Sequence, residues 1–216
     1  MPFDFYVRSM QDLVEAVQAF GILPYFATSI PGFSLEEHCS PDVLWSEDEN
    51  NSWEWKGPVI RESGCAYGKF FENKAVFISR EWFPDFANYR RDGYDFDARF
   101  DDGLASYRDR ELFELLDSRA PVLSRRLKKE GDYRKDGKKG FDTIITRLQA
   151  QGYVLISDFV YEKDKFGNTY GWGVAEYSTP EKFFGTAFTS KVYSCEPEES
   201  GRKVLISLRL KWSRKD

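Results

Sequence analysis

The sequence holds a single histidine, His38, among its 216 residues, and this scarcity removes several classes of enzyme site. A Ser-His-Asp triad needs a histidine base, and no serine in the chain lies in a motif that would place it beside His38. A zinc site needs several cysteine and histidine ligands at short spacings, and no CxxC or HxxxH pattern occurs. We therefore expect neither a metal nor any other cofactor.

Cysteine is also scarce. The three cysteines, Cys39, Cys65 and Cys195, lie far apart and are odd in number. We interpret them as free thiols inside the fold. No stretch approaches the roughly 18 continuous apolar residues of a membrane helix. The first residues mix apolar and acidic side chains, unlike a signal peptide. These absences predict a soluble, cytoplasmic protein with no membrane partner.

Aromatic residues and unevenly distributed charge are what the chain has in abundance. Aromatics make up 17% of the residues, enough to build a core without disulfides. The net charge of −5 opposes a general attraction to nucleic acid. From Arg125 to Lys139, however, eight basic residues face three acidic ones, a net charge of +5 that leaves −10 for the rest of the chain. Such a basic island fits a phosphate backbone, or a solvated helical surface.

Three helices and a two-stranded hairpin are predicted in the second half of the chain. Helical spacing favours helices over Leu104–Leu116, from Pro121 to Gly131, and from Lys138 or Lys139 to Gln151. Two β-rich runs follow, Tyr153–Tyr161 and Thr169–Tyr177, around a polar tip with a Gly-Asn turn. This order predicts a winged helix, a fold that usually binds either nucleic acid or another protein.

The third predicted helix has two distinct faces. Phe141, Ile144, Ile145 and Leu148 cluster on one side, and the opposite side carries Arg147 among small and hydroxyl residues. Such an outer face suits a DNA major groove, and equally an ordinary solvated surface. The side chains predicted to bind nucleic acid are Arg125, Arg126, Lys128, Lys138, Lys139, Arg147 and Lys163.

The first half of the chain predicts a mixed α/β region built around another hairpin. This hairpin joins the β-rich runs Tyr67–Phe71 and Lys74–Ser79. Ser9 is predicted to cap one helix, and Ser79 a second helix over Arg80–Arg91.

Five aspartates mark residues 92–103, which lack the spacing of a calcium-binding EF-hand and are predicted to be a solvated linker. We therefore expect an α+β fold in two parts. Residues 1–103 form an N-terminal α+β region with a β-hairpin, and residues 104–216 form a winged-helix domain with a C-terminal extension.

Three tryptophans, Trp45, Trp53 and Trp55, fall in an acidic segment over Asp42–Trp55 that is predicted to be a loop. Their rings would pin this loop to the body of the protein. The alternative is a contact surface on which bases stack, although the neighbouring carboxylates would repel phosphates.

Two stretches resemble a known family. The first, Phe71–Pro84 continuing to Arg91, joins an aromatic-glutamate pair, a small apolar run, an acidic-Trp-Pro turn and a basic end. The second, Pro121–Gly152, contains the second and third predicted helices. Together they resemble the AlkZ/YcaQ family, bacterial winged-helix proteins that unhook DNA interstrand crosslinks and excise bulky alkylated bases. The chain is most similar to the shorter AlkZ-related proteins, and the resemblance implies double-stranded or damaged DNA as a partner.

The catalytic motif of that family has no counterpart here. In the family it is Gln-apolar-Gln or Gln-apolar-Asp near the N-terminus, whereas Gln149-Ala150-Gln151 lies in the third predicted helix. Residues two apart on a helix point about 200° from each other and cannot converge on one substrate atom. The resemblance therefore assigns no catalytic residue, and enzymatic activity stays open.

Three functions remain open. The first is a DNA-binding relative of crosslink-repair glycosylases that lacks their catalytic motif. The second is a protein-interaction winged helix within a larger assembly. The third is an active glycosylase whose catalytic carboxylate is one of Glu54, Glu62, Glu72, Glu81 and Asp85.

Overall fold

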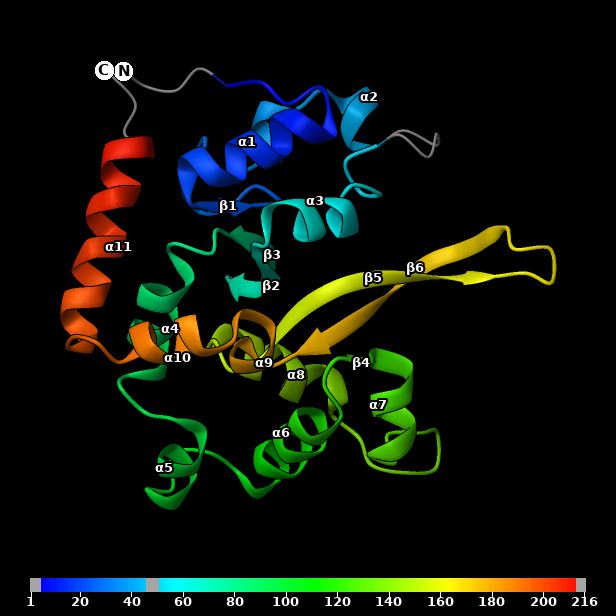
Figure 1. The fold of residues 1–216 in the computed structure, drawn as a ribbon, viewed down its shortest axis with the longest axis vertical. Helices are drawn as coiled ribbons and strands as arrows, with labels where there is room; N and C mark the ends of the chain where they lie inside the picture. The colour runs from blue at the N-terminus through cyan, green and yellow to red at the C-terminus, as the bar shows by residue number, and fades with distance from the viewer. Residues whose placement is uncertain (1–4, 46–50, 213–216) are drawn as a thin grey trace.

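The computed structural model describes residues 5–45 and 51–212, and its strands form one antiparallel sheet (Figure 1). The six strands lie in the order β1-β3-β2-β5-β6-β4. Strands β5 and β6 form a hairpin that projects beyond the body of the molecule (Figure 1). The strands span Ile22–Pro24 (β1), Ala66–Phe71 (β2), Lys74–Ile78 (β3), Val122–Leu123 (β4), Leu155–Lys163 (β5) and Thr169–Ser178 (β6).

Helices surround the rest of the sheet. In the view of Figure 1, α1 to α3 lie above it and α5 to α8 below it, while α11 stands on the side opposite the hairpin tip. The helices span Met10–Phe20 (α1), Pro41–Leu44 (α2), Lys56–Ser63 (α3), Phe83–Arg91 (α4), Phe96–Asp101 (α5), Tyr107–Arg119 (α6), Ser124–Glu130 (α7), Phe141–Ala150 (α8), Pro180–Phe184 (α9), Thr186–Val192 (α10) and Pro197–Trp212 (α11), with a 3-10 turn at Glu36–His38.

The structure confirms the predicted start of the first helix and the first hairpin. The Ser9 hydroxyl accepts a hydrogen bond from the Asp12 backbone at 3.2 Å, and the Asp12 carboxylate accepts one from the Ser9 backbone at 3.0 Å. This reciprocal pair satisfies two backbone donors that a helix start otherwise leaves free. Strands β2 and β3 pair with Tyr67 opposite Phe77, as the alternating pattern predicts.

The second half follows the predicted order of three helices and a hairpin, with one strand added. Helix α6 begins after Leu104, because Ser106 and Asp109 form a capping box there. The prediction that Pro121 starts the next helix is wrong. Val122 and Leu123 instead form β4, which pairs with β6 before α7 begins.

The predicted linker over residues 92–103 is wrong, because it contains helix α5. The Asp95 carboxylate caps this helix by accepting a hydrogen bond from the Ala98 backbone at 2.8 Å. Phe96 is buried and stacks on Phe113 of α6, with ring centroids 4.0 Å apart. The predicted cap at Ser79 is also wrong, since α4 begins four residues later without a side-chain cap.

The tryptophan-rich segment is only partly a loop, because α2 occupies its beginning. Trp55 is buried, Trp53 is half-buried, and Trp45 is 57% exposed while it stacks on Phe26. Packing against the body therefore accounts for Trp55 but not for Trp45. Residues 46–50 of this segment lie outside the described residues.

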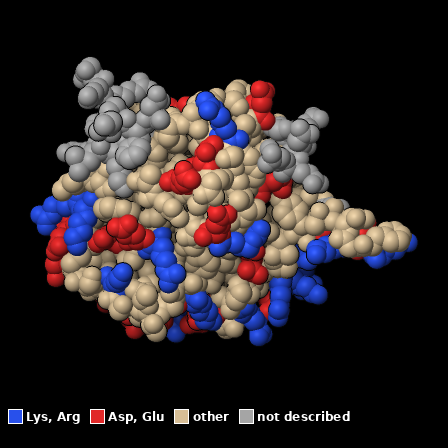
Figure 2. Space-filling view, turned by 45° about the horizontal axis from the view of Figure 1, so that its top comes forward, with Lys and Arg blue, Asp and Glu red and all other residues tan. Residues whose placement is uncertain are grey.

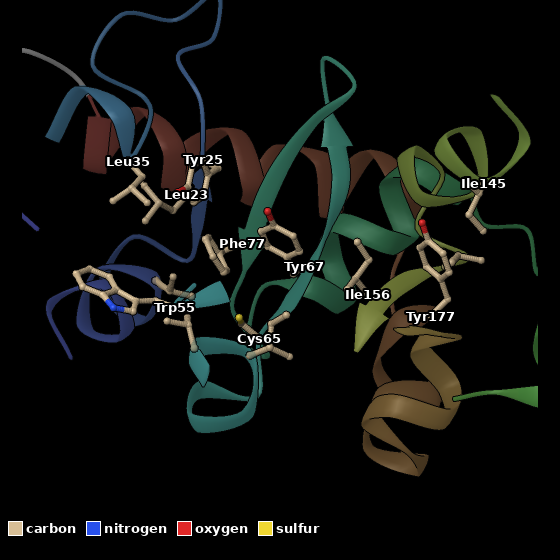
Figure 3. Close-up of a cluster of buried hydrophobic side chains, with 14 of the residues drawn as sticks. Leu23, Tyr25, Leu35, Trp55, Cys65, Tyr67, Phe77, Ile145, Ile156 and Tyr177 are labelled. Atoms are coloured by element: carbon tan, nitrogen blue, oxygen red, sulfur yellow. The ribbon is translucent and has the colours of Figure 1, made fainter. Parts of the chain in front are cut away.

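One hydrophobic core joins the two halves of the chain. Figure 3 shows buried side chains of the first half, among them Leu23, Tyr25 and Trp55, in one cluster with Ile156 and Tyr177 of the hairpin. The sheet is continuous across the same junction, because Tyr67 of β2 pairs with Ile156 of β5. The predicted division at residues 103–104 stays a prediction about chain organisation, since both parts contribute to this sheet.

Arg91, at the end of α4, is buried and ties four segments together. Its guanidinium donates to the Gly152 carbonyl at 2.8 Å, to the Glu181 carboxylate at 2.7 Å and to the Tyr193 hydroxyl at 3.0 Å. The guanidinium carbon also lies 4.6 Å from the centroid of the Tyr153 ring. A buried cation is tolerated only when paired and hydrogen-bonded in this way.

We expect the substitution Arg91→Met to lower the free energy of unfolding by about 3 kcal/mol, because it leaves a carbonyl and a carboxylate without their donor. Its neighbour Arg90 is exposed and donates to the Ala150 carbonyl, so Arg90→Met is the matched control with a loss of about 1 kcal/mol or less. Urea denaturation of both variants provides the comparison. Equal losses would contradict the assigned role of Arg91.

Candidate nucleic-acid interface

Helix α7 carries much of the basic island and lies along the base of the hairpin. It packs against β6 and β4, and its Leu127 is buried while Arg125, Arg126 and Lys129 are exposed. Arg125 forms an ion pair with Glu162 of β5, which connects the helix to the hairpin. Figure 2 shows basic side chains beneath the base of the projecting hairpin and at its tip. The basic island thus adjoins the hairpin. We call the cations of α7 together with Lys163 and Lys165 of the hairpin the basic edge.

Carboxylates of the protein itself pair with five of the seven cations predicted to bind nucleic acid. The pairs are Arg125–Glu162, Arg126–Glu130, Lys128–Asp142, Lys138–Glu111 and Arg147–Asp109. The first four join exposed or half-buried side chains, and pairs of that kind contribute about 0–1 kcal/mol each. A phosphate could therefore replace these carboxylates at small cost.

The fifth pair, between Arg147 and Asp109, joins an exposed arginine to a buried carboxylate. Asp109 is 5% exposed, accepts a hydrogen bond from the Ser106 backbone at 3.0 Å, and accepts another from Arg147 Nε at 3.1 Å. Burial disfavours its charged form, but these hydrogen bonds outweigh burial and lower the pKa of Asp109. Arg147 thereby anchors α8 to α6, and its predicted contact with DNA stays a prediction.

The other two predicted cations, Lys139 and Lys163, have no salt bridge to any residue that the structure describes. Lys163 ends strand β5, and Lys165 follows it at the tip of the hairpin. Phe166 and Trp172, on the same part of the hairpin, are each 77% exposed. Exposed apolar rings on a hairpin that also carries lysines, with Lys165 Nζ 4.9 Å from the centroid of the Phe166 ring, suit a ligand that offers both flat rings and negative charge.

A second cluster, which sequence reasoning missed, lies where the hairpin leaves the body. Lys56, the first residue of α3, is only 5% exposed. Its Nζ lies 3.0 Å from the centroid of the Trp53 ring and 4.5 Å from that of Phe159. Burial lowers the pKa of Lys56 from 10.5 to about 7, and the charge of Glu54 opposes the shift only in part.

The carboxylate of Glu54 also accepts a short hydrogen bond from the hydroxyl of Tyr161, which lies on β5. Burial and this carboxylate together raise the pKa of Tyr161. We call Trp53, Glu54, Lys56, Phe159 and Tyr161 the Lys56 cluster.

Glycine lets the elements of this cluster approach closely. Gly57 of α3 faces β5, and a Cβ there would lie 3.0 Å from the Asp158 carboxylate and 3.6 Å from Phe159 Cβ. Gly173 of β6 similarly leaves room for the ring of Tyr161. A larger residue at position 57 would therefore crowd the Asp158 and Phe159 side chains between α3 and β5.

A protein-family model described as "AlkZ related" matches residues 7–216. The chain belongs to the AlkZ-related family. Comparisons with curated proteins and with solved structures each found no match. Family membership relates the chain to DNA-repair glycosylases, and it confirms the resemblance seen in the sequence.

Most of the carboxylates considered as catalytic in a member of this family have other partners or lie at the surface. Glu72 accepts hydrogen bonds from Ser29, and Asp85 accepts one from Ser200 at 2.8 Å. Glu62 and Glu81 are exposed. Glu54 differs from these four, because it lies beside a buried amine.

Two further observations bear on ligands and location. Within residues 5–45 and 51–212, no three His, Cys, Asp or Glu side chains are grouped so that they could hold a metal ion. No helix in the same ranges is long and apolar enough to span a membrane.

The buried amine predicts a pH-dependent stability. The unfolded chain keeps the Lys56 proton up to about pH 10.5, whereas the folded protein releases it near pH 7. Between these values the unfolded state binds more protons, so wild-type stability rises with pH, by at most about 1.4 kcal/mol per pH unit. Lys56→Met should be more stable than the wild type near neutral pH, and its advantage should shrink at higher pH.

Urea denaturation at about pH 6 and about pH 9 measures this difference. The Tyr161–Glu54 hydrogen bond beside the amine is present in both proteins, so the comparison isolates Lys56. A stability difference that does not change with pH would show that Lys56 titrates as an ordinary lysine.

Proposed function

We propose that this protein binds DNA through the basic edge, as a member of a family related to DNA-repair glycosylases. One observation carries the proposal: the exposed cations of α7 adjoin the projecting hairpin that bears Lys163 and Lys165. The phosphate backbone offers a row of negative charges, and cations along an edge can follow it. The acidic remainder of the chain would orient the molecule with this edge toward DNA.

We further propose that residues from α6 to β6 form a winged helix. The order α6-β4-α7-α8-β5-β6 supports this, because a short strand between the first two helices pairs with the last strand of the hairpin. The hairpin β5–β6 then corresponds to the wing. The outer face of α8 is the less suitable contact, since Arg147 is engaged with Asp109.

The exposed ion pairs also suit a protein that must release DNA. In the free protein, Arg125 and Arg126 are neutralised by Glu162 and Glu130, so the edge does not repel itself. On binding, each arginine exchanges a carboxylate for a phosphate and counterions are released. Such contacts read the backbone and its shape rather than the base sequence.

Salt-dependent binding tests the proposal. The double variant Arg126→Gln/Lys163→Gln should bind a DNA duplex at least about tenfold more weakly at 50 mM salt, and its salt slope should fall by up to about 1.8. Both effects follow from the loss of two phosphate contacts. Fluorescence anisotropy between about 50 and 200 mM salt measures affinity and slope together.

Lys191→Gln/Arg202→Gln is the matched control, because it removes the same charge from exposed positions on α10 and α11. A control variant as weak as the test variant would mean that net charge, not the basic edge, governs binding. No binding by the wild type to duplex, branched or crosslinked DNA at low salt would end the proposal.

The aromatic residues of the hairpin predict a further contact. Trp172→Ala should weaken binding to DNA with unpaired bases by about 1–3 kcal/mol, the value of one base stacked on an aromatic ring. Tyr107→Ala is the control, since Tyr107 is an aromatic residue of similar exposure, 74%, on α6. Anisotropy with a gapped duplex makes the comparison.

The protein-interaction alternative keeps one supporting observation, the same exposed rings Phe166 and Trp172. Under that alternative, Trp172→Ala would leave DNA affinity unchanged and weaken self-association or binding to a protein partner.

A further inference from the structure

The amine of Lys56 has two properties that DNA binding through the basic edge does not use. It is 5% exposed, and no hydrogen-bond acceptor for it is found in the part of the chain that the structure describes. A lysine that served only packing would extend its amine to water, as its flexible stem allows. Here the rings of Trp53 and Phe159 lie against the amine, and most of the side chain is covered.

The rest of the Lys56 cluster supplies groups that can move protons. The Tyr161 hydroxyl donates to the Glu54 carboxylate, and the charge of Glu54 acts on Lys56. Trp53, Glu54, Phe159 and Tyr161 are each half-buried, so the amine lies one side chain beneath the surface. An amine, a carboxylate and a hydroxyl in this arrangement form an acid–base set around a nucleophile.

We propose that Lys56 is a nucleophilic amine that condenses with the aldehyde of an abasic deoxyribose in DNA. The inference rests on the proposed DNA binding, because Phe159 and Tyr161 belong to the same hairpin whose outer part would contact DNA. A neutral lysine attacks carbonyl carbon without a cofactor. An abasic sugar lacks a stacked base, so turning it out of the duplex costs least.

The condensation forms one C–N bond and releases one water. The lone pair of Lys56 Nζ forms a bond to C1′ of the ring-opened sugar, and the π electrons of the carbonyl move to its oxygen. That oxygen takes a proton from the Tyr161–Glu54 pair and gives a carbinolamine. The nitrogen, which became positively charged on attack, returns one proton to the Tyr161–Glu54 pair. It loses its second proton as the hydroxyl is protonated and leaves as water, so a neutral imine remains between Nζ and C1′. No redox change occurs.

Burial makes this chemistry possible at neutral pH. With its pKa lowered to about 7, about half of Lys56 is neutral at pH 7, against about one in 3,000 for a lysine at 10.5. Lys69 of β2 is exposed and provides the natural comparison within the same protein.

Borohydride trapping tests the proposal. Borohydride reduces the imine to a stable secondary amine, so the full-length protein mixed with an abasic-site duplex should give a covalent complex. Mass spectrometry should locate the adduct on Lys56. Lys56→Arg and Lys56→Met should each lower the yield at least about tenfold, whereas Lys69→Arg should leave it unchanged. Trapping that persists in both Lys56 variants, or a wild type that binds abasic DNA without trapping, would overturn the proposal.

A small aldehyde separates this proposal from DNA binding. Glycolaldehyde with cyanoborohydride should label Lys56 at least about tenfold faster than Lys69 at pH 7. Equal labelling of Lys56 and Lys69 would contradict the assignment of Lys56 as a nucleophile. Preferential labelling of Lys56 by a protein that fails to bind any DNA would overturn the abasic substrate and, separately, the proposed function.

Discussion

The buried guanidinium of Arg91 fixes both ends of the hairpin on which the functional proposals depend. Its carbonyl acceptor, Gly152, lies just before β5, and its carboxylate partner, Glu181, lies just after β6. One side chain of α4 therefore clamps the two ends where the hairpin joins the body. The pairing of β2 with β5 then sets the direction of the hairpin relative to the N-terminal strands. With its base held in this way, the hairpin can project beyond the core and still have a defined position.

Sequence patterns predicted the elements whose information is local. The capping box at Ser9 and the hairpin around Tyr67 and Phe77 depend on residues a few positions apart, and both are confirmed. Strand β4 has only two residues and is defined by its backbone pairing with β6, so no pattern of side chains predicts it. Asp95 is a suitable N-cap for helix α5, but the high density of aspartates around it favoured the prediction of a solvated linker. Tertiary packing of Phe96 on Phe113 decided the outcome.

At the candidate sites too, the sequence pattern does not show contacts between residues that are far apart in the chain. The count of basic residues between Arg125 and Lys139 located the basic edge, but it could not reveal that Arg125, Lys128 and Lys138 pair with carboxylates from outside this segment. Arg147 followed the helical pattern of an outer face, yet Asp109 of α6 engages it. The sequence does not indicate that Lys56 is buried, since a lysine in the first turn of a helix is normally solvated. Its burial depends on Phe159, about a hundred residues later in the sequence.

The proposed function requires that α7 and the outer hairpin form a single surface for DNA. Hydrogen exchange of the full-length protein with and without a DNA duplex at low salt tests it directly, because bound segments exchange more slowly. We expect slower exchange in both Ser124–Glu130 and Lys163–Trp172, with α11 unchanged. Slower exchange confined to α11 or to α1, or in only one of the two segments, would contradict it.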